Sequence, residues 1–142
     1  MGRTIESFSH TGDVGFALSA DDLDDLFDAA REALLQVLVA TPPEHGDDER
    51  TVELTAPGLD VLLVRWLEEI LYLHATEALL AASAGPRVQH RDDGWHLAAR
   101  VRLAPMAPDA HGSWREVKAV TYHGLEVTRD EAGWHARVVL DV

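Results

Sequence analysis

Residues Val88–Leu103 have the sequence VQHRDDGWHLAARVRL, and this stretch decides the fold class. Two runs of alternating character, Val88–Arg91 and Trp95–Leu103, flank the residues Asp92-Asp93-Gly94. An Asp-Gly turn between alternating runs is typical of a β-hairpin, so we predict an antiparallel pair of strands here.

The same pattern continues toward the C-terminus. Tight turns at His123-Gly124 and Glu131-Ala132-Gly133 separate further short runs, and consecutive strands joined in this way pair antiparallel. A Pro-rich loop is expected over Ala104–Gly112. The later strands are predicted at Leu79–Ser83, Lys118–Tyr122, Leu125–Arg129 and Trp134–Leu140.

The first half of the chain carries two helical patterns. Asp21 and Asp22 can cap a helix whose apolar residues recur from Leu23 to Val37, and Pro42-Pro43 ends it. A second helix over Leu59–Thr76 is apolar nearly all round, which predicts a central helix covered on more than one side. Strands are predicted around these helices at Arg3–Ser9, Val14–Ser19 and Arg50–Thr55.

The order of the elements predicts an α+β domain, with two helices packed on a largely antiparallel sheet. The chain has 142 residues, of which 46% are hydrophobic, so residues 1–142 are expected to form one domain with a sizeable core.

The charge balance restricts the partners. Twelve basic and 25 acidic residues give a formal net charge of -13, which repels phosphate backbones. We therefore expect no direct binding to nucleic acid, and the natural partners of such a surface are basic proteins and divalent cations. There is no cysteine, which excludes disulfides and thiolate chemistry.

A membrane role is not expected. Residues 1–10 lack the apolar core of a signal peptide, and the most apolar stretch, Leu59–Leu73, carries four charged residues. The composition is compatible with a cytoplasmic protein. The chain also lacks a phosphate-binding Gly-rich loop, a nucleophile elbow and a His-Glu-x-x-His zinc motif, so we do not expect an enzyme.

Three carboxyl groups are candidates for a cation site. Asp13 lies between two predicted strands, and Asp141 and Val142 end the last strand. Asp13 and Asp141, with the carboxylate of Val142 if it ends the chain, offer the oxygen ligands that Ca²⁺ prefers. Alternatively, Asp13 forms an Asx-turn with its own backbone and Asp141 is a solvated strand end.

Other polar residues have similar alternatives. Lys118, within an apolar strand, is expected to be a snorkelling residue at a sheet edge, and His123 is either a base or a turn histidine. The acidic stripe, defined as Asp21, Asp25, Asp28 and Glu32, is either a solvated helix face or a docking surface for a basic partner.

Four blocks in order resemble the archease family. The first, His10–Gly15 (HTGDVG), is similar to the family's N-terminal signature, although Gly12 stands where alanine is common. Leu62–Leu73 resembles its central helix, Glu116–Val127 (EVKAVTYHGLEV) is the most specific match, and Asp141-Val142 fits the family's ending. Residues 82–112 match least and indicate nothing about function.

This resemblance implies an SHS2-like fold and a role as activator of an RtcB-type RNA ligase in tRNA splicing and RNA repair. Archeases are thought to promote guanylylation of the ligase and so restore it for further rounds. The resemblance also implies that Asp13, Asp141 and Val142 hold a divalent metal, Ca²⁺ in the first place, and that Lys118 lies in the active region.

Two other functions remain open. One is a metal-dependent hydrolase that uses the same carboxylates, for which only His10 and His123 are candidate bases. The other is a general chaperone or adaptor that binds basic proteins through the acidic stripe.

Overall fold

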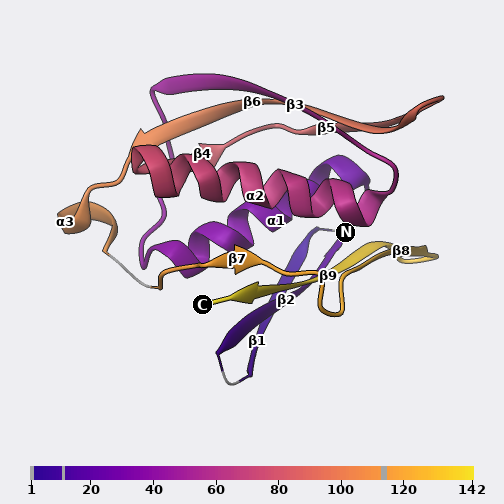
Figure 1. The fold of residues 1–142 in the computed structure, drawn as a ribbon, viewed down its shortest axis with the longest axis horizontal. Helices are drawn as coiled ribbons and strands as arrows, with labels where there is room; N and C mark the ends of the chain where they lie inside the picture. Colours follow the sequence, from indigo (N-terminus) through magenta and orange to yellow (C-terminus); the bar gives the residue numbers. More distant parts are fainter. Residues whose placement is uncertain (1, 11, 113–114) are drawn as a thin grey trace.

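The strands form two antiparallel sheets, and the two long helices lie between them (Figure 1). The computed structural model describes residues 2–10, 12–112 and 115–142. The terminal sheet contains β1 (Thr4–His10), β2 (Asp13–Ala20), β7 (Ala119–Val120), β8 (Glu126–Asp130) and β9 (Gly133–Asp141). The middle sheet contains β3 (Asp48–Ala56), β4 (Leu79–Ser83), β5 (Arg87–Arg91) and β6 (Gly94–Pro105).

The predicted hairpin is confirmed as β5 and β6, which pair antiparallel from Arg91 opposite Gly94. β6 is the centre of the middle sheet, because β3, β4 and β5 all pair with it. In the terminal sheet β2 and β9 are central, with β1 at one edge and β7 and β8 at the other. The α+β class is therefore confirmed, with two antiparallel sheets in place of the single sheet that was predicted. Periodicity identifies strands but does not say which of them share a sheet.

The first helix, α1 (Leu23–Leu38), begins as predicted, because the carboxylate of Asp22 accepts a hydrogen bond of 2.8 Å from the backbone N–H of Asp25. It ends at Leu38, before the two prolines, because Val39 leaves the helical conformation.

The second helix, α2 (Leu59–Glu77), packs beside α1 and contacts strands of both sheets. This explains why it is apolar nearly all round. Trp66 is fully buried, and its indole N–H donates a hydrogen bond of 2.9 Å to the carbonyl oxygen of Phe27 on α1. No helix in the described part of the chain is long and apolar enough to cross a membrane.

Buried Arg31 ties α1 to the middle sheet. Its guanidinium donates to the carboxylate of Asp28 and to the carbonyl oxygens of Ala81 and Ala82 at 2.9 and 3.1 Å. The pairing of β4 with β6 shifts register between Ala81 and Ser83, so this irregular strand turns carbonyls toward the helix.

Two local predictions were wrong. The loop predicted over Ala104–Gly112 contains the end of β6 and a short helix, α3 (Pro108–His111), which starts at a proline as helices often do. The strand predicted over Lys118–Tyr122 is reduced to Ala119–Val120, because the chain turns where the N–H of Leu125 donates to the carbonyl of Tyr122.

Candidate carboxylate site at the end of the terminal sheet

The structure brings Asp13 and Asp141 together. They are opposite each other in the antiparallel pairing of β2 with β9, although they lie near opposite ends of the chain. Directly opposed residues project to the same face of a sheet. Val14, Phe16 and Leu18 of β2 are buried against the helices, so the alternating residue Asp13 lies on the outer face.

The backbone hydrogen bonds beside Asp13 and Asp141 show that their Cα atoms are close together. The backbone N–H of Val142 donates to the carbonyl of Gly12 at 3.2 Å, one residue outside the pair on each strand. Asp13 and Asp141 are therefore a non-hydrogen-bonded pair, in which the Cα atoms are about 4.5 Å apart. The same bond holds Val142 beside the two aspartates.

Gly12 has a structural role in the turn before Asp13. The pairing of β1 with β2 closes at His10 opposite Asp13, which leaves a two-residue connection, and Gly12 has a φ of 79°. Two-residue hairpins need positive φ, which glycine adopts without cost.

Gly15 has a different role, which is to make room for an aromatic ring. It is opposite Phe8, and a Cβ at Gly15 would overlap the ring of Phe8. The guanidinium of Arg137 also lies over the Phe8 ring, 4.1 Å from its centroid. The Phe8 ring and the Arg137 guanidinium thus lie on the outer face, beside Gly15, which is two residues from Asp13 on β2.

Lys118 lies next to the carboxylate pair through its backbone, whose N–H donates to the carbonyl of Asp141 at 2.8 Å. It is exposed and lines a shallow hollow of about 300 Å³ with Glu68 and Tyr72 of α2. The structure therefore brings Lys118 to the edge of the site, between β9 and α2.

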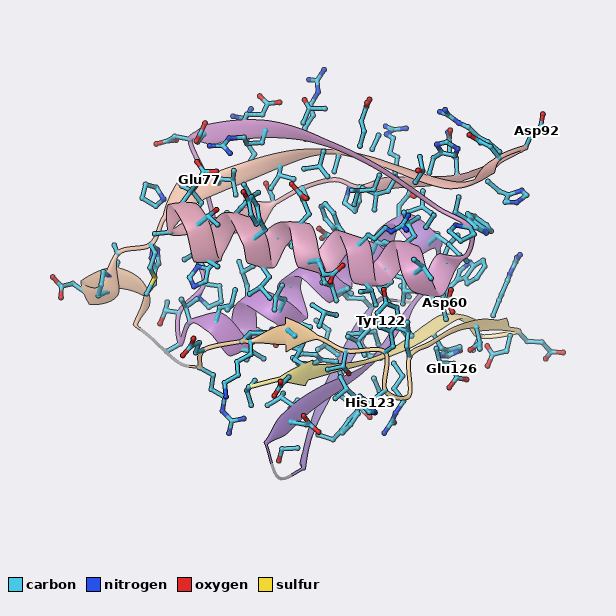
Figure 2. The ribbon with its side chains drawn as sticks, viewed as in Figure 1. Asp60, Glu77, Asp92, Tyr122, His123 and Glu126 are labelled. Atoms are coloured by element: carbon cyan, nitrogen blue, oxygen red, sulfur yellow. The ribbon has the colours of Figure 1, made fainter. Side chains whose placement is uncertain are left out.

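His123 is not brought to the site. It is exposed in the loop between β7 and β8 (Figure 2). Its neighbour Gly124 lies against Arg137, four residues before Asp141 on β9, which corresponds to about 13 Å of extended strand. The side chain of His10 and all of Thr11, both in the block His10–Gly15, lie outside the described residues.

Among the side chains that the structure describes, none pairs with the charge of Asp13 or Asp141. Both are partly buried, and from the described residues neither carboxylate receives a hydrogen bond or an ion pair. The Asx-turn interpretation of Asp13 is therefore not supported. Two close carboxylates repel unless a cation or a proton neutralises them.

Hard oxygen donors of this kind fit Ca²⁺ or Mg²⁺. No group of three or more His, Asp or Glu side chains among the described residues is arranged to hold a metal ion. A cation here would need further oxygens, from the Val142 carboxylate if it ends the chain, from backbone carbonyls, from water or from a partner. Metal binding by Asp13, Asp141 and Val142 stays a prediction.

Two of the four carboxylates of the acidic stripe form ion pairs within the chain. The carboxylate of Asp25 pairs with Arg3, and Asp28 pairs with Arg3 at 3.0 Å and with Arg31 at 2.8 Å. Burial would raise the pKa of Asp28, but the hydrogen bonds and charges of Arg31 and Arg3 lower it below its ordinary value. The interpretation as a plainly solvated face was wrong for these two residues, because the helix packs on the sheets.

Comparison with known proteins agrees with this architecture. The family described as "Archease protein family (MTH1598/TM1083)" matches residues 6–142. The chain belongs to this family. The archease of Methanosarcina mazei is 32% identical over 143 residues, covering 100% of this chain and 98% of the relative.

Solved structures of archeases share the fold. The solution structure of protein 1598 of Methanobacterium thermoautotrophicum has a TM-score of 0.83 and 34% identity, over 97% of this chain and 98% of that one. The crystal structure of a Thermotoga maritima protein described as "an archease, possible chaperone" has a TM-score of 0.59 at 19% identity, over 96% of each chain, and shows the fold alone. The resemblance seen in the four sequence blocks is thus confirmed at the level of the family.

Proposed function

We propose that this archease is a non-enzymatic activator of an RtcB-type RNA ligase, in cytoplasmic tRNA splicing and RNA repair, and that it acts through the Asp13–Asp141 pair. The observation that carries the proposal is the register of β2 on β9, which places two carboxylates opposite each other, with no cationic partner among the described side chains. Two carboxylates held close together on a rigid sheet, at a strand end that a partner can reach, are well placed to form a functional site.

The chain's own groups have separate tasks in this proposal. Asp13 and Asp141 supply anionic oxygens, and the hydrogen bond from Val142 N–H to Gly12 fixes their spacing. Lys118, exposed beside Asp141, supplies a mobile positive charge that attracts the phosphates of the ligase's nucleotide.

A divalent cation is the expected cofactor, with Ca²⁺ as the first candidate and Asp13, Asp141 and Val142 as its ligands. When bound between the two proteins, such a cation offsets phosphate charge during nucleotide transfer. Two aspartates are fewer than the six to eight oxygens that Ca²⁺ takes, so phosphate oxygens of the partner can complete the set. The proposal therefore predicts weak cation binding by the free chain and stronger binding in the complex.

The two competing functions have less support. An adaptor that docks basic proteins on the acidic stripe would compete with Arg3 and Arg31 for Asp25 and Asp28. A hydrolase needs a base at the carboxylates, and no described side chain supplies one. His123 lies away from them, and the side chain of His10, whose backbone is opposite Asp13, lies outside the described residues.

A multiple-turnover ligation assay tests the proposal, with the cognate ligase, GTP and a divalent metal. We expect the wild-type chain to raise the number of rounds per ligase and Asp13→Asn to lose this stimulation. Asp92→Asn is the matched control, because it removes the same charge at the exposed tip of the β5–β6 hairpin, far from the site (Figure 2). Equal stimulation by all three chains would contradict the assigned site, and no stimulation by any would contradict the function.

A further inference from the structure

The outer face of the middle sheet collects four arginines. Side chains alternate along a strand, and the buried residues Leu97, Ala99, Val101 and Leu103 of β6 face the helices. Their exposed neighbours therefore share the outer face with the outward residues of β5. The four are Arg87 and Arg91 on β5 and Arg100 and Arg102 on β6, and we call them the arginine face.

These arginines are short of carboxylates in a chain where 25 acids face 12 bases. Among the described residues Arg87 has no ion pair. Arg91 contacts the amide oxygen of Gln89 at 3.5 Å and acts on the carboxylate of Asp93 through its charge, without a close ion pair. Arg100 and Arg102 share Glu49, at 3.9 and 3.8 Å.

The pairs made elsewhere in the chain are tighter. Arg50, for example, reaches both carboxylate oxygens of Glu77 at 2.8 and 2.7 Å. Exposed pairs near 4 Å contribute little, so the arginine face keeps most of its positive charge.

Two other acids lie on this side of the sheet. The carboxylate of Asp93 is hydrogen-bonded to Nε2 of His96 at 2.7 Å. Glu53 is opposite Ala98 on one flank, while Arg87 is opposite Ala98 on the other. The two charges are thus two strand spacings apart, about 10 Å, with a small side chain between them.

A shallow trough runs over Ala98. Two hollows of about 450 and 500 Å³ share Arg87 and Ala98 in their walls, and one extends to Arg91 and the other to Arg100. The lining also includes Thr51 and Thr55 on β3 and one acid, Glu53. Three of the four arginines, Arg87, Arg91 and Arg100, line the trough.

We propose that the arginine face binds the phosphate backbone of single-stranded RNA. Guanidinium groups bind phosphate oxygens in a bidentate manner, and nucleic-acid interfaces are polar and rich in positive charge. A docking site for a protein would offer apolar or aromatic anchors at its centre, and this face has none among its described residues. The expectation of no direct binding to nucleic acid was drawn from the net charge, which does not show how charges are distributed between the faces of the folded chain.

This inference rests on the proposed function for its biological setting, since an RNA ligase would bring its substrate close to a docked activator. The net charge of -13 opposes the free RNA, so affinity is weak and strongly dependent on salt. Four phosphate contacts on a single strand predict a loss of roughly 50-fold in affinity between 50 and 200 mM salt, and two contacts predict roughly 7-fold.

An NMR titration of the isotope-labelled chain with a ten-nucleotide oligouridine RNA tests the proposal. At 50 mM salt we expect amide shifts confined to β3, β5 and β6. The double variant Arg87→Ala/Arg100→Ala should bind at least 10-fold more weakly and show the shallower salt dependence. Arg129→Ala is the control for single loss of charge, because Arg129 lies on the terminal sheet over Trp134. All variants change exposed residues, and their amide spectra report whether the fold is kept.

Three results would overturn the proposal: no shifts on the middle sheet, shifts centred on Lys118, or equal affinity for a ten-residue poly-glutamate peptide. The last would assign the face to an acidic protein segment. The ligation assay separates this inference from the proposed function. Stimulation that persists without RNA binding rejects the arginine face alone, whereas RNA binding without stimulation rejects the activator role alone.

Discussion

Replacing Asp13 by asparagine removes one charge of the carboxylate pair and keeps the shape of the side chain. The Cα atoms of this pair are about 4.5 Å apart. Two unit charges at about 4 Å repel by about 1 kcal/mol in water and about 4 kcal/mol at an effective dielectric constant of 20. Because both aspartates are partly exposed, the lower figure applies. We therefore expect Asp13→Asn to stabilise the metal-free chain by about 1 kcal/mol, a rise in Tm of roughly 4 °C.

A divalent cation should reverse this order. A ligand at 10 times its dissociation constant adds about 1.4 kcal/mol to the free energy of unfolding, and Asp13→Asn loses most of that gain because it lacks one ligand. The assay is urea unfolding at pH 7 with a chelator and again with millimolar Ca²⁺ or Mg²⁺. Asp92→Asn should match the wild type in both conditions, since it lies far from the pair.

Two results would refute this reasoning. If Asp13→Asn is less stable than the wild type in chelator, the carboxylate is a structural hydrogen-bond acceptor and not half of a repelling pair. If Ca²⁺ stabilises the wild type and Asp13→Asn equally, the cation binds elsewhere.

Three further predictions concern packing and titration. Asp28→Asn should cost about 2 kcal/mol of unfolding free energy, because it weakens the pairing of buried Arg31 while the side chain of Asp28 is 21% exposed. Arginine contacts lower the folded pKa of Asp28, so its contribution to stability is present above the unfolded pKa of 3.8 and is lost as pH falls through the folded pKa. Urea unfolding of the wild type and Asp28→Asn from about pH 5 to 2 measures this loss. Burial lowers the pKa of His74, whose Nδ1 has no hydrogen-bond partner among the described residues, so stability should fall as pH drops below 6.5, and less so in His74→Gln. Gly15→Ala should destabilise the chain by about 1 kcal/mol because it displaces the Phe8 ring, and the cost should shrink in a Phe8→Ala background, as a double-mutant cycle by thermal melting would report.

Local structure was predictable from the sequence where local chemistry determines it. The β5–β6 hairpin follows from its Asp-Gly turn, and α1 begins at the capping residue Asp22. The apolar circumference of α2 also predicted a central helix, although the second sheet that covers it was not foreseen. The missing information is which strands pair, which depends on tertiary packing and not on periodicity.

The candidate site shows the same division. Asp13 and Asp141 could be proposed from residue type and family resemblance, but their contact depends on pairing between β2 and β9 across almost the whole chain. The arginine face was missed for a related reason. Its members are scattered through a stretch of mixed charge, and only the alternation of β5 and β6 gathers them on one face. The alternate spacing of Arg100 and Arg102 was a signal that the sequence did contain.

Guanylylation of the cognate ligase tests the central claim most directly. The ligase would be allowed one round of ligation and then incubated with radiolabelled GTP, a divalent metal and the wild-type chain, Asp141→Asn or Asp92→Asn. The account predicts that the wild type and Asp92→Asn speed incorporation of label into the ligase, while Asp141→Asn leaves it at the rate of the ligase alone. Equal acceleration by Asp141→Asn would show that the carboxylate pair is not the centre through which this archease acts.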